Sequence, residues 1–285
     1  MVISKIQGGL GNQMFQFAAA FAQDMNVFLD LDNIKQKKVD SDNFTNRAFE
    51  LDLFPNIQYT ELPKFEKKIF FSKNLLFKLI RKLYPVQVRT QQENELVEIP
   101  ACKMLYLDGY FQSEKYFKNK RQELLQQFEF PELDSINQQL RERILSTTNS
   151  VSVHIRRGDY LKTEVQKYHG ILPFTYYEES IALLESNYSD LTLVIFSDDV
   201  AFTQTIFKEY KNVIVVAGNQ DCGWKDMALM SYCKHHIIAN SSFSWWGAWL
   251  SQQANGMNIA PKNWFNREVV SFDINDIIPE SWIKI

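Results

Sequence analysis

Short apolar runs alternate with amphipathic helical stretches along most of the chain, and this alternation constrains the fold more than any other feature. Residues 2–6, 151–155 and 191–196 each have the pattern of a buried strand. Helical stretches at 12–24 and 175–186 follow such runs. Strands that alternate with helices predict a parallel sheet covered by helices. The sequence therefore predicts an α/β fold.

The length of the chain indicates two domains of this class. A chain of 285 residues suits two domains of about 140 residues each. The polar run STTNS at 146–150 precedes a strand and indicates the junction, so we predict domains at 1–148 and 149–285. No pattern identifies the structure of 33–66. Further strands are expected at 26–31, 103–107, 212–216, 236–239 and 257–260, and further helices at 113–128 and 224–233.

Composition excludes several classes of protein. The net charge of -3 gives no general basis for nucleic-acid binding. Cys102, Cys222 and Cys233 are odd in number and lack metal-binding spacing, which argues against a disulfide framework or a zinc site. Free thiols suit a reducing cytosol. The start of the chain lacks the apolar core of a signal peptide, and no apolar run is long enough to span a bilayer. A cytoplasmic, soluble protein is expected.

The segment VSVHIRRGDY at 151–160 is the most informative motif. Because side chains alternate along a strand, Val151, Val153 and Ile155 should face one way and His154 and Arg156 the other. Open α/β sheets bind ligands beyond the carboxyl ends of their strands, where the motif continues with Arg157, Gly158 and Asp159. Adjacent guanidinium groups suit a pyrophosphate. The alternatives are a surface RRGD turn paired with carboxylates and, for His154, a hydrogen-bonded core histidine.

A glycine-rich turn lies at the other end of the chain, in QGGLGNQMFQFAAA at 7–20. Gly8, Gly9 and Gly11 follow a strand and precede a helix, with Asn12 available as a cap. Such a turn lets backbone N–H groups approach a phosphate or a sugar closely. The spacing differs from G-x-G-x-x-G, which weakens a dinucleotide-binding interpretation. A merely tight strand-to-helix turn is the alternative.

Two further segments place polar groups after strands. In IFSDD at 195–199, a carboxylate can accept hydrogen bonds from a guanine or a ribose, and alternatively Ser197 or Asp198 caps the next helix. In IIANSSFSWWGAWL at 237–250, hydroxyl and amide groups at a helix start can bind phosphate. Helical spacing favours core packing over a sugar site for the tryptophans of this segment. The residues of interest are Ser197, Asp198, Asp199, Asn240, Ser241 and Ser242, together with the backbone N–H of Phe243.

Two remaining features bear on metal binding and on contact with a membrane surface. Asp30 and Asp32 form a D-x-D sequence, but paired arginines can neutralise a diphosphate without a metal, and we predict none. Residues 67–84, KKIFFSKNLLFKLIRKLY, carry six cations, no acids and many large apolar side chains. This pattern suits an ordinary surface helix with its apolar side in the core. It also suits peripheral contact with an anionic membrane surface.

Taken together, the motifs resemble one family. GGLGNQMFQFA at the start, LDGYFQS at 107–113, HIRRGDY, FSDD and NSSFSWWGAWL are similar to segments of the α-1,2-fucosyltransferases of glycosyltransferase family 11. The resemblance implies a GT-B-like arrangement of two Rossmann-like domains facing each other across a cleft. It implies GDP-β-L-fucose as donor, the 2-hydroxyl of a terminal β-galactoside as acceptor, and inversion without a cofactor. The acceptor would be a surface glycan such as an O-antigen, free or lipid-linked.

The same resemblance assigns roles to residues. Arg156 and Arg157 are expected to bind the diphosphate, together with Asn240, Ser241, Ser242 and Phe243. Ser197, Asp198 and Asp199 are expected at the nucleoside, and the loop Gly8, Gly9, Gly11 and Asn12 at the donor. The expected catalytic residues are Arg156 with Asp159 or His154 as general base. Two alternatives remain open, a transferase for another GDP-sugar such as GDP-mannose and a catalytically silent glycan-binding protein.

Overall fold

The protein folds into two compact α/β units. The computed structural model describes residues 1–35, 47–91, 95–156, 170–266, 269 and 276–285. The chain divides between Pro131 and Glu132, and residues 276–279 return to the first unit. Helix α6 (Ser135–Leu145), which the sequence boundary at 148/149 assigns to the first domain, belongs to the second unit. It packs on α10 (Trp224–Tyr232), and Asn137 and Asn219 exchange side-chain hydrogen bonds of 3.1 and 3.0 Å.

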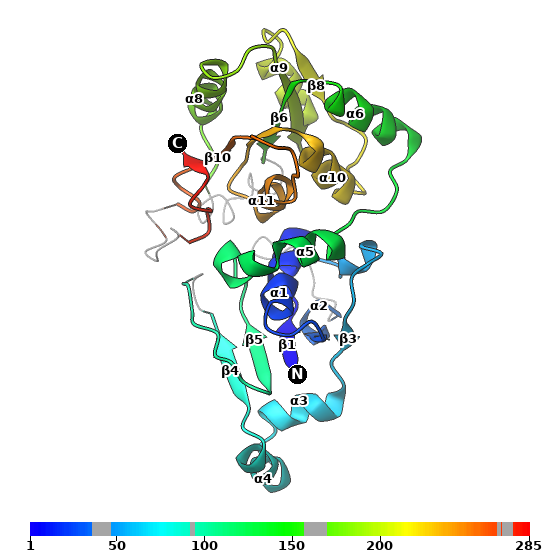
Figure 1. Ribbon diagram of the computed structural model, residues 1–285, viewed down its shortest axis with the longest axis vertical. Coiled ribbons are helices and arrows are strands. Elements are labelled where there is room, and N and C mark those ends of the chain that lie inside the picture. Colours follow the sequence, from blue (N-terminus) through cyan, green and yellow to red (C-terminus); the bar gives the residue numbers. More distant parts are fainter. Residues whose placement is uncertain (36–46, 92–94, 157–169, 267–268, 270–275) are drawn as a thin grey trace. The chain divides into compact units, whose positions relative to one another are not determined.

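The first unit contains a parallel sheet with the order β3-β2-β1-β5-β4 among its described residues (Figure 1). Helix α1 (Leu10–Phe21) packs on the face of β1 that carries Ser4, whose hydroxyl donates to the Gln16 carbonyl. Helix α3 (Lys64–Phe71) packs near Ile3 and Tyr106. The strands are β1 Val2–Lys5, β2 Val27–Asp30, β3 Thr60–Glu61, β4 Gln87–Thr90 and β5 Leu105–Asp108. The other elements are α2 Asp32–Lys35, η1 Leu51–Leu53, α4 Leu75–Leu83, η2 Glu114–Tyr116, η3 Lys118–Lys120 and α5 Arg121–Gln127.

Helix α1 is the centre of the first unit. Its sequence is apolar on nearly every side, and nearly every residue of it is buried, as such a composition requires. Phe15 packs on Phe117 with ring centroids 6.0 Å apart. The predicted helix at 113–128 is wrong, because the chain there forms two short 3₁₀ turns before α5. Phe117 leaves the helical conformation, with φ of -145°, and its ring is fully buried beside that of Phe15.

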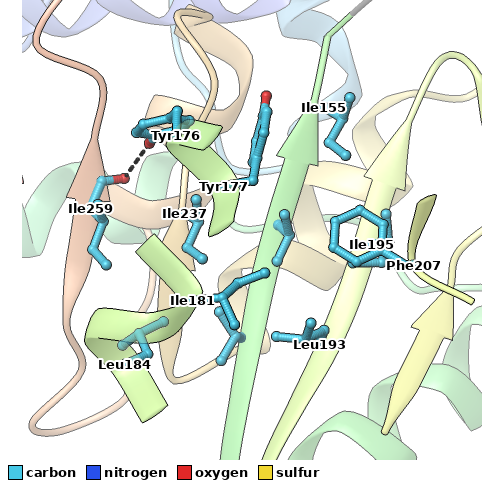
Figure 2. Close-up of a cluster of buried hydrophobic side chains, with 12 residues drawn as sticks. Ile155, Tyr176, Tyr177, Ile181, Leu184, Leu193, Ile195, Phe207, Ile237 and Ile259 are labelled. Carbon is cyan, nitrogen blue, oxygen red and sulfur yellow. Dashed lines mark hydrogen bonds between the residues drawn. The ribbon is translucent and has the colours of Figure 1, made fainter. Parts of the chain in front are cut away.

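The second unit contains a parallel sheet with the described strand order β11-β10-β9-β6-β7-β8. Every residue of the central strand β6 is buried. Figure 2 shows the core on one face, where Tyr176 and Ile181 of α8 lie over Ile195 and Ile237 of the sheet. The strands are β6 Asn149–Ile155, β7 Leu191–Ser197, β8 Val213–Val215, β9 His235–Ile237, β10 Asn258–Ala260 and β11 Ile283–Lys284. The remaining helices are α8 Phe174–Glu185, α9 Val200–Ile206 and α11 Ser242–Trp249.

Both units confirm the predicted α/β fold class, because each has a parallel sheet with helices packed on it. Val151, Val153 and Ile155 belong to the core beneath α8, while His154 lies near Phe243 of α11. The predicted alternation of faces along this strand is therefore confirmed. None of the helices in the described ranges is long and apolar enough to cross a bilayer.

Candidate functional site

The carboxyl ends of β6 and β7 bring two of the expected site residues together. The strands pair in parallel register, with Ile155 opposite Ser197. Arg156 and Asp198 follow directly, and the guanidinium Nη1 lies 3.1 Å from the Asp198 Oδ2. The two side chains are 25% and 26% exposed, so the arginine is oriented by a carboxylate but remains accessible. This is the edge of the sheet where open α/β folds bind ligands.

The two neighbouring carboxylates of FSDD have different structural roles. Asp198 pairs with Arg156. Asp199 caps α9, because its Oδ1 accepts from the Phe202 N–H at 3.1 Å, and its own N–H donates to the Ser197 hydroxyl at 3.0 Å. The expectation that Ser197 or Asp198 would be the cap is wrong. A role for these residues in recognising a nucleoside stays a prediction.

The start of α11 lies beside the same edge of the sheet, since β9 precedes it and pairs with β6. The Ser241 hydroxyl caps the helix by accepting from the Phe243 N–H at 3.3 Å. The buried Asn240 side chain donates to the Trp264 carbonyl at 3.2 Å and fixes the turn before the helix. Ser242 is the first helical residue and is only partly buried. This turn and helix start therefore present hydroxyl and N–H groups of the kind that bind phosphate.

The tryptophans of α11 belong to the core of the second unit. Trp245, Trp246 and Trp249 are buried and pack on one another, with ring centroids 5.1 to 6.1 Å apart. Core packing, which the helical spacing favours, is confirmed for all three.

His154 is enclosed beneath this edge. Its ring is buried 5.7 Å from that of Phe243, its Nδ1 has no hydrogen-bond partner among the described residues, and its carbonyl accepts from the Tyr177 hydroxyl at 3.2 Å. Burial, and then the positive charge of Arg156, lower the pKa of His154 to about 3. The imidazole is therefore neutral near pH 7 and a weak base. Arg157, Gly158 and Asp159 lie outside the described residues.

The glycine-rich loop of the first unit has a backbone that requires glycine at one position. Gly8 has φ of +80°, and a Cβ there would lie 2.6 Å from Asn12 Nδ2. The expected cap at Asn12 is wrong, because α1 begins at Leu10 with Gly9 as its N-cap. Asn12 instead accepts from Gln112 Nε2 at 2.7 Å, which joins the two motifs GGLGNQ and LDGYFQS within one unit.

Gln13 and Gln16 hold this loop, and sequence reasoning did not single them out. Both are buried. Gln13 Nε2 donates to the carbonyls of Gly8 at 2.9 Å and Ala48 at 2.8 Å, and its Oε1 accepts from the Glu50 N–H. Gln16 Oε1 accepts from the N–H of residue 7 at 3.0 Å. The available signal was two amide side chains three residues apart in an otherwise apolar helix.

Replacement of Gln13 by leucine is expected to lower the free energy of unfolding by about 3 kcal/mol, because it leaves buried backbone groups unpaired at about 1–3 kcal/mol each. Urea unfolding followed by circular dichroism measures the change. Gln139→Leu, at an exposed position of α6, is the matched control and should change stability by no more than about 0.5 kcal/mol. Equal stability of the Gln13→Leu and Gln139→Leu variants would contradict the role of Gln13 in holding the loop.

The D-x-D carboxylates are engaged by a lysine. Lys67 Nζ of α3 lies 2.6 Å from both Asp30 Oδ2 and Asp32 Oδ2, and the Tyr106 hydroxyl donates to Asp30 at 2.6 Å. Burial raises the pKa of Asp30, but the hydrogen bonds from Lys67 and Tyr106 outweigh it and the net shift is downward. Within the part of the chain that the structure describes, no group of three or more histidine, cysteine or acidic side chains is placed to hold a metal ion.

Comparison with known proteins defines the class of this chain. The model of the family described as "Glycosyl transferase family 11" matches residues 1–285. An alpha-1,2-colitosyltransferase of Escherichia coli is 35% identical and the match covers 100% of this chain and 99% of that protein. The O-antigen biosynthesis glycosyltransferase WbnK of Escherichia coli is 32% identical over 99% of both chains. A match of this extent makes the chain a glycosyltransferase of the fucosyltransferase type.

The chain belongs to glycosyl transferase family 11, the family that its motifs resemble. A second group of relatives matches only in part. The galactoside 2-alpha-L-fucosyltransferase Sec1 of Mus musculus is 29% identical over 50% of this chain and 41% of its own length. Among solved structures, fucosyltransferase NodZ from Bradyrhizobium is similar with 12% identity and a TM-score of 0.45, over 86% of this chain and 91% of that chain.

Proposed function

We propose that this protein is an inverting α-1,2-fucosyltransferase that moves L-fucose from GDP-β-L-fucose to the 2-hydroxyl of a terminal β-galactoside in a surface glycan. The observation that carries the proposal is the Arg156–Asp198 pair beside the start of α11, at the carboxyl ends of β6 and β7. Membership of family 11 supports the reaction class. The names of the relatives support an α-1,2 linkage and a glycan acceptor.

The proposed reaction depends mainly on stabilising the charge of the leaving group. Negative charge grows on the GDP diphosphate as the bond to the sugar breaks, so a cation fixed beside it stabilises the transition state more than the bound donor. Arg156, held in place by Asp198, meets this requirement, and the hydroxyl groups of Ser241 and Ser242 with the Ser242 N–H add hydrogen bonds.

The remaining roles are proposals that rest on chemistry. We assign the general base to Asp159 rather than His154, because an imidazole with a pKa of about 3 is a poor proton acceptor near pH 7. We also propose that no metal is needed, since Arg156 and Arg157 can neutralise the diphosphate. The carboxylates of Asp30 and Asp32 already bind the Lys67 ammonium.

Transfer of colitose is the second candidate, and a specific observation favours it. The relative that matches over the full length at 35% identity is described as a colitosyltransferase. Colitose differs from fucose by the absence of the 3-hydroxyl, so the two donors differ in one hydrogen-bonding group. The choice between them is a question of donor selectivity within the same proposed mechanism.

The test compares kcat/KM for GDP-fucose and GDP-colitose by GDP release with a panel of β-galactosides. A site that hydrogen-bonds the 3-hydroxyl rejects the deoxy sugar strongly, by as much as about 10⁴–10⁵-fold. A site shaped for the deoxy sugar excludes the hydroxylated one by only about 10²-fold. We expect a preference for GDP-fucose of at least about 10²-fold. The reverse preference would assign colitose transfer.

Two controls complete this test. Magnetic-resonance analysis of the product should show an α-linkage to the 2-hydroxyl of galactose. GDP-mannose should support no comparable turnover. Calorimetry that detects glycan binding but no GDP binding would replace the enzyme proposal with that of a silent glycan-binding protein.

A further inference from the structure

The α3–α4 hairpin, residues 64–84 of the first unit, is a fixed structure with an unusual surface. Asn74 caps α4 by accepting from the Leu76 N–H at 3.0 Å. Arg81 of α4 donates to the carbonyls of Ile69 and Ser72 at 2.6 and 2.8 Å. The rings of Phe65 and Phe77 lie 5.6 Å apart. These contacts fix one side of α4 against α3, so the opposite side of α4 is presented in a defined orientation.

The apolar side of α4 faces away from the core. Leu75, Leu76, Leu79 and Leu83 are 71%, 59%, 54% and 76% exposed, while Phe77 is the buried residue of this helix. With 3.6 residues per turn, the four leucines fall within an arc of about 100°. A surface helix normally turns such a stripe toward the core. The interpretation of 67–84 as a helix with its apolar side in the core is therefore wrong for α4.

Exposed lysines accompany this stripe in the same hairpin, and Lys78 and Lys82 flank it on α4 itself. Lys68, Lys73, Lys78 and Lys82 are exposed, and none of them has an ion pair with a described residue. Glu66 is the single acid of residues 64–84. Lys67 is occupied by Asp30 and Asp32 and does not belong to this surface. The exposed side of the hairpin thus combines leucines with uncompensated positive charge.

Helix α4 lies at the end of the first unit opposite to its candidate ligand-binding edge, because α3 starts after the carboxyl end of β3 and runs back toward the starts of the strands. Ile69 and Phe70 at the end of α3 pack with Met1 and Met104, which stand at the starts of β1 and β5. Figure 1 shows α4 beyond α3 at this end of the unit. The glycine-rich loop follows the carboxyl end of β1. A partner bound to the exposed side of α4 would therefore leave that loop uncovered.

We propose that the α3–α4 hairpin docks on the surface of an anionic phospholipid bilayer. The four leucines enter the boundary between headgroups and acyl chains, and the lysines contact lipid phosphates. Charge complementarity selects this occupant, because two copies of such a basic surface would repel each other whereas an anionic membrane attracts it. The inference goes beyond the proposed transferase activity and does not depend on it.

The test is co-sedimentation of the full chain with vesicles. One set contains phosphatidylcholine alone and the other phosphatidylcholine mixed with phosphatidylglycerol. We expect binding to the anionic vesicles that is at least about tenfold stronger than to the neutral ones and that weakens with added salt. Lys78→Glu with Lys82→Glu should weaken binding by about fivefold or more for each charge. Leu76→Ser, Leu79→Ser and Leu83→Ser together should abolish it.

Matched control variants test whether loss of vesicle binding is specific to the hairpin or follows from any change of surface apolarity or charge. Ile136→Ser with Leu145→Ser removes exposed apolar side chains of α6, and Lys208→Glu with Lys211→Glu reverses exposed charges elsewhere. These variants should bind vesicles as the unchanged chain does. All substituted side chains are exposed, so melting temperatures should remain close to that of the unchanged chain.

Two results would overturn the proposal. One is equal sedimentation of the leucine variant and the unchanged chain with anionic vesicles at low salt, including the case in which neither binds. The other is self-association without lipid that the leucine substitutions abolish, measured by analytical ultracentrifugation, together with no vesicle binding. That second result would assign the surface to another copy of the chain.

Discussion

Replacement of Arg156 by alanine is expected to lower kcat by about 10²–10³-fold, the usual cost of removing one electrostatic donor from a developing negative charge. The guanidinium projects from the end of β6 and is partly exposed, so its removal leaves no cavity in the core. GDP release at saturating donor and acceptor measures the effect. A loss confined to KM would mean that the arginine binds donor and transition state equally.

Conservative variants test the geometry of the pair. Arg156→Lys should also be impaired, because an ammonium group cannot reproduce the planar fork of the guanidinium. Asp198→Asn should lower kcat less than Arg156→Ala, since it loosens the arginine without removing it. Arg143→Ala, at an exposed position of α6, is the matched control and should retain full activity. A kcat for Arg156→Ala close to that of the control would refute the assignment to the leaving diphosphate.

The sequence predicts the buried elements better than their contacts. Strands β6 and β7 carry closely spaced large apolar residues, and their predicted ranges differ from the observed ones by no more than two residues. Strands β3 and β11 contain only two residues each, too few for any periodicity to appear. The failure at 113–128 has a different cause, because the burial of Phe117 under Phe15 overrides local helical preference.

The same limit applies to the candidate site. The motifs located Arg156 and Asp198, but their pairing requires β6 and β7 to be neighbours in register, which only the sheet reveals. Likewise, periodicity predicts an amphipathic α4 but does not show which side meets the core. Arg81 and Phe77, on the side opposite to the leucines, make the contacts with α3 and decide that orientation.

Among the residues that the structure describes, three histidines of the second unit are buried and have the same effect on stability. Burial lowers the pKa values of His154, His235 and His236 to about 3, 4 and 3, and the positive charges of Arg156 and Lys234 add to the effect at His154 and His235. His236 Nδ1 lies 2.8 Å from the Ser152 hydroxyl, and His235 Nδ1 accepts from the Met257 N–H at 3.1 Å. These rings are neutral in the folded protein across the physiological range.

The three buried rings are therefore expected to remove about 6 kcal/mol of unfolding free energy between about pH 7 and pH 5. Below the unfolded histidine pKa of about 6.5 the unfolded chain binds protons that the folded chain excludes, and each buried ring costs about 1.4 kcal/mol per pH unit. The raised pKa values of Glu50 and Asp226 act in the opposite direction and reduce the slope. Urea unfolding at a series of pH values measures the loss.

A single substitution isolates the histidine contribution. His236→Asn keeps a polar partner for Ser152 but cannot take up a proton in this range, so the slope of stability against pH should fall by about 1.4 kcal/mol per unit below about pH 6. An exposed substitution such as Gln139→Leu should leave the slope unchanged. If the unchanged chain is as stable at about pH 5 as at about pH 7, the rings are accessible to protons in the folded state, and their enclosure does not govern acid stability.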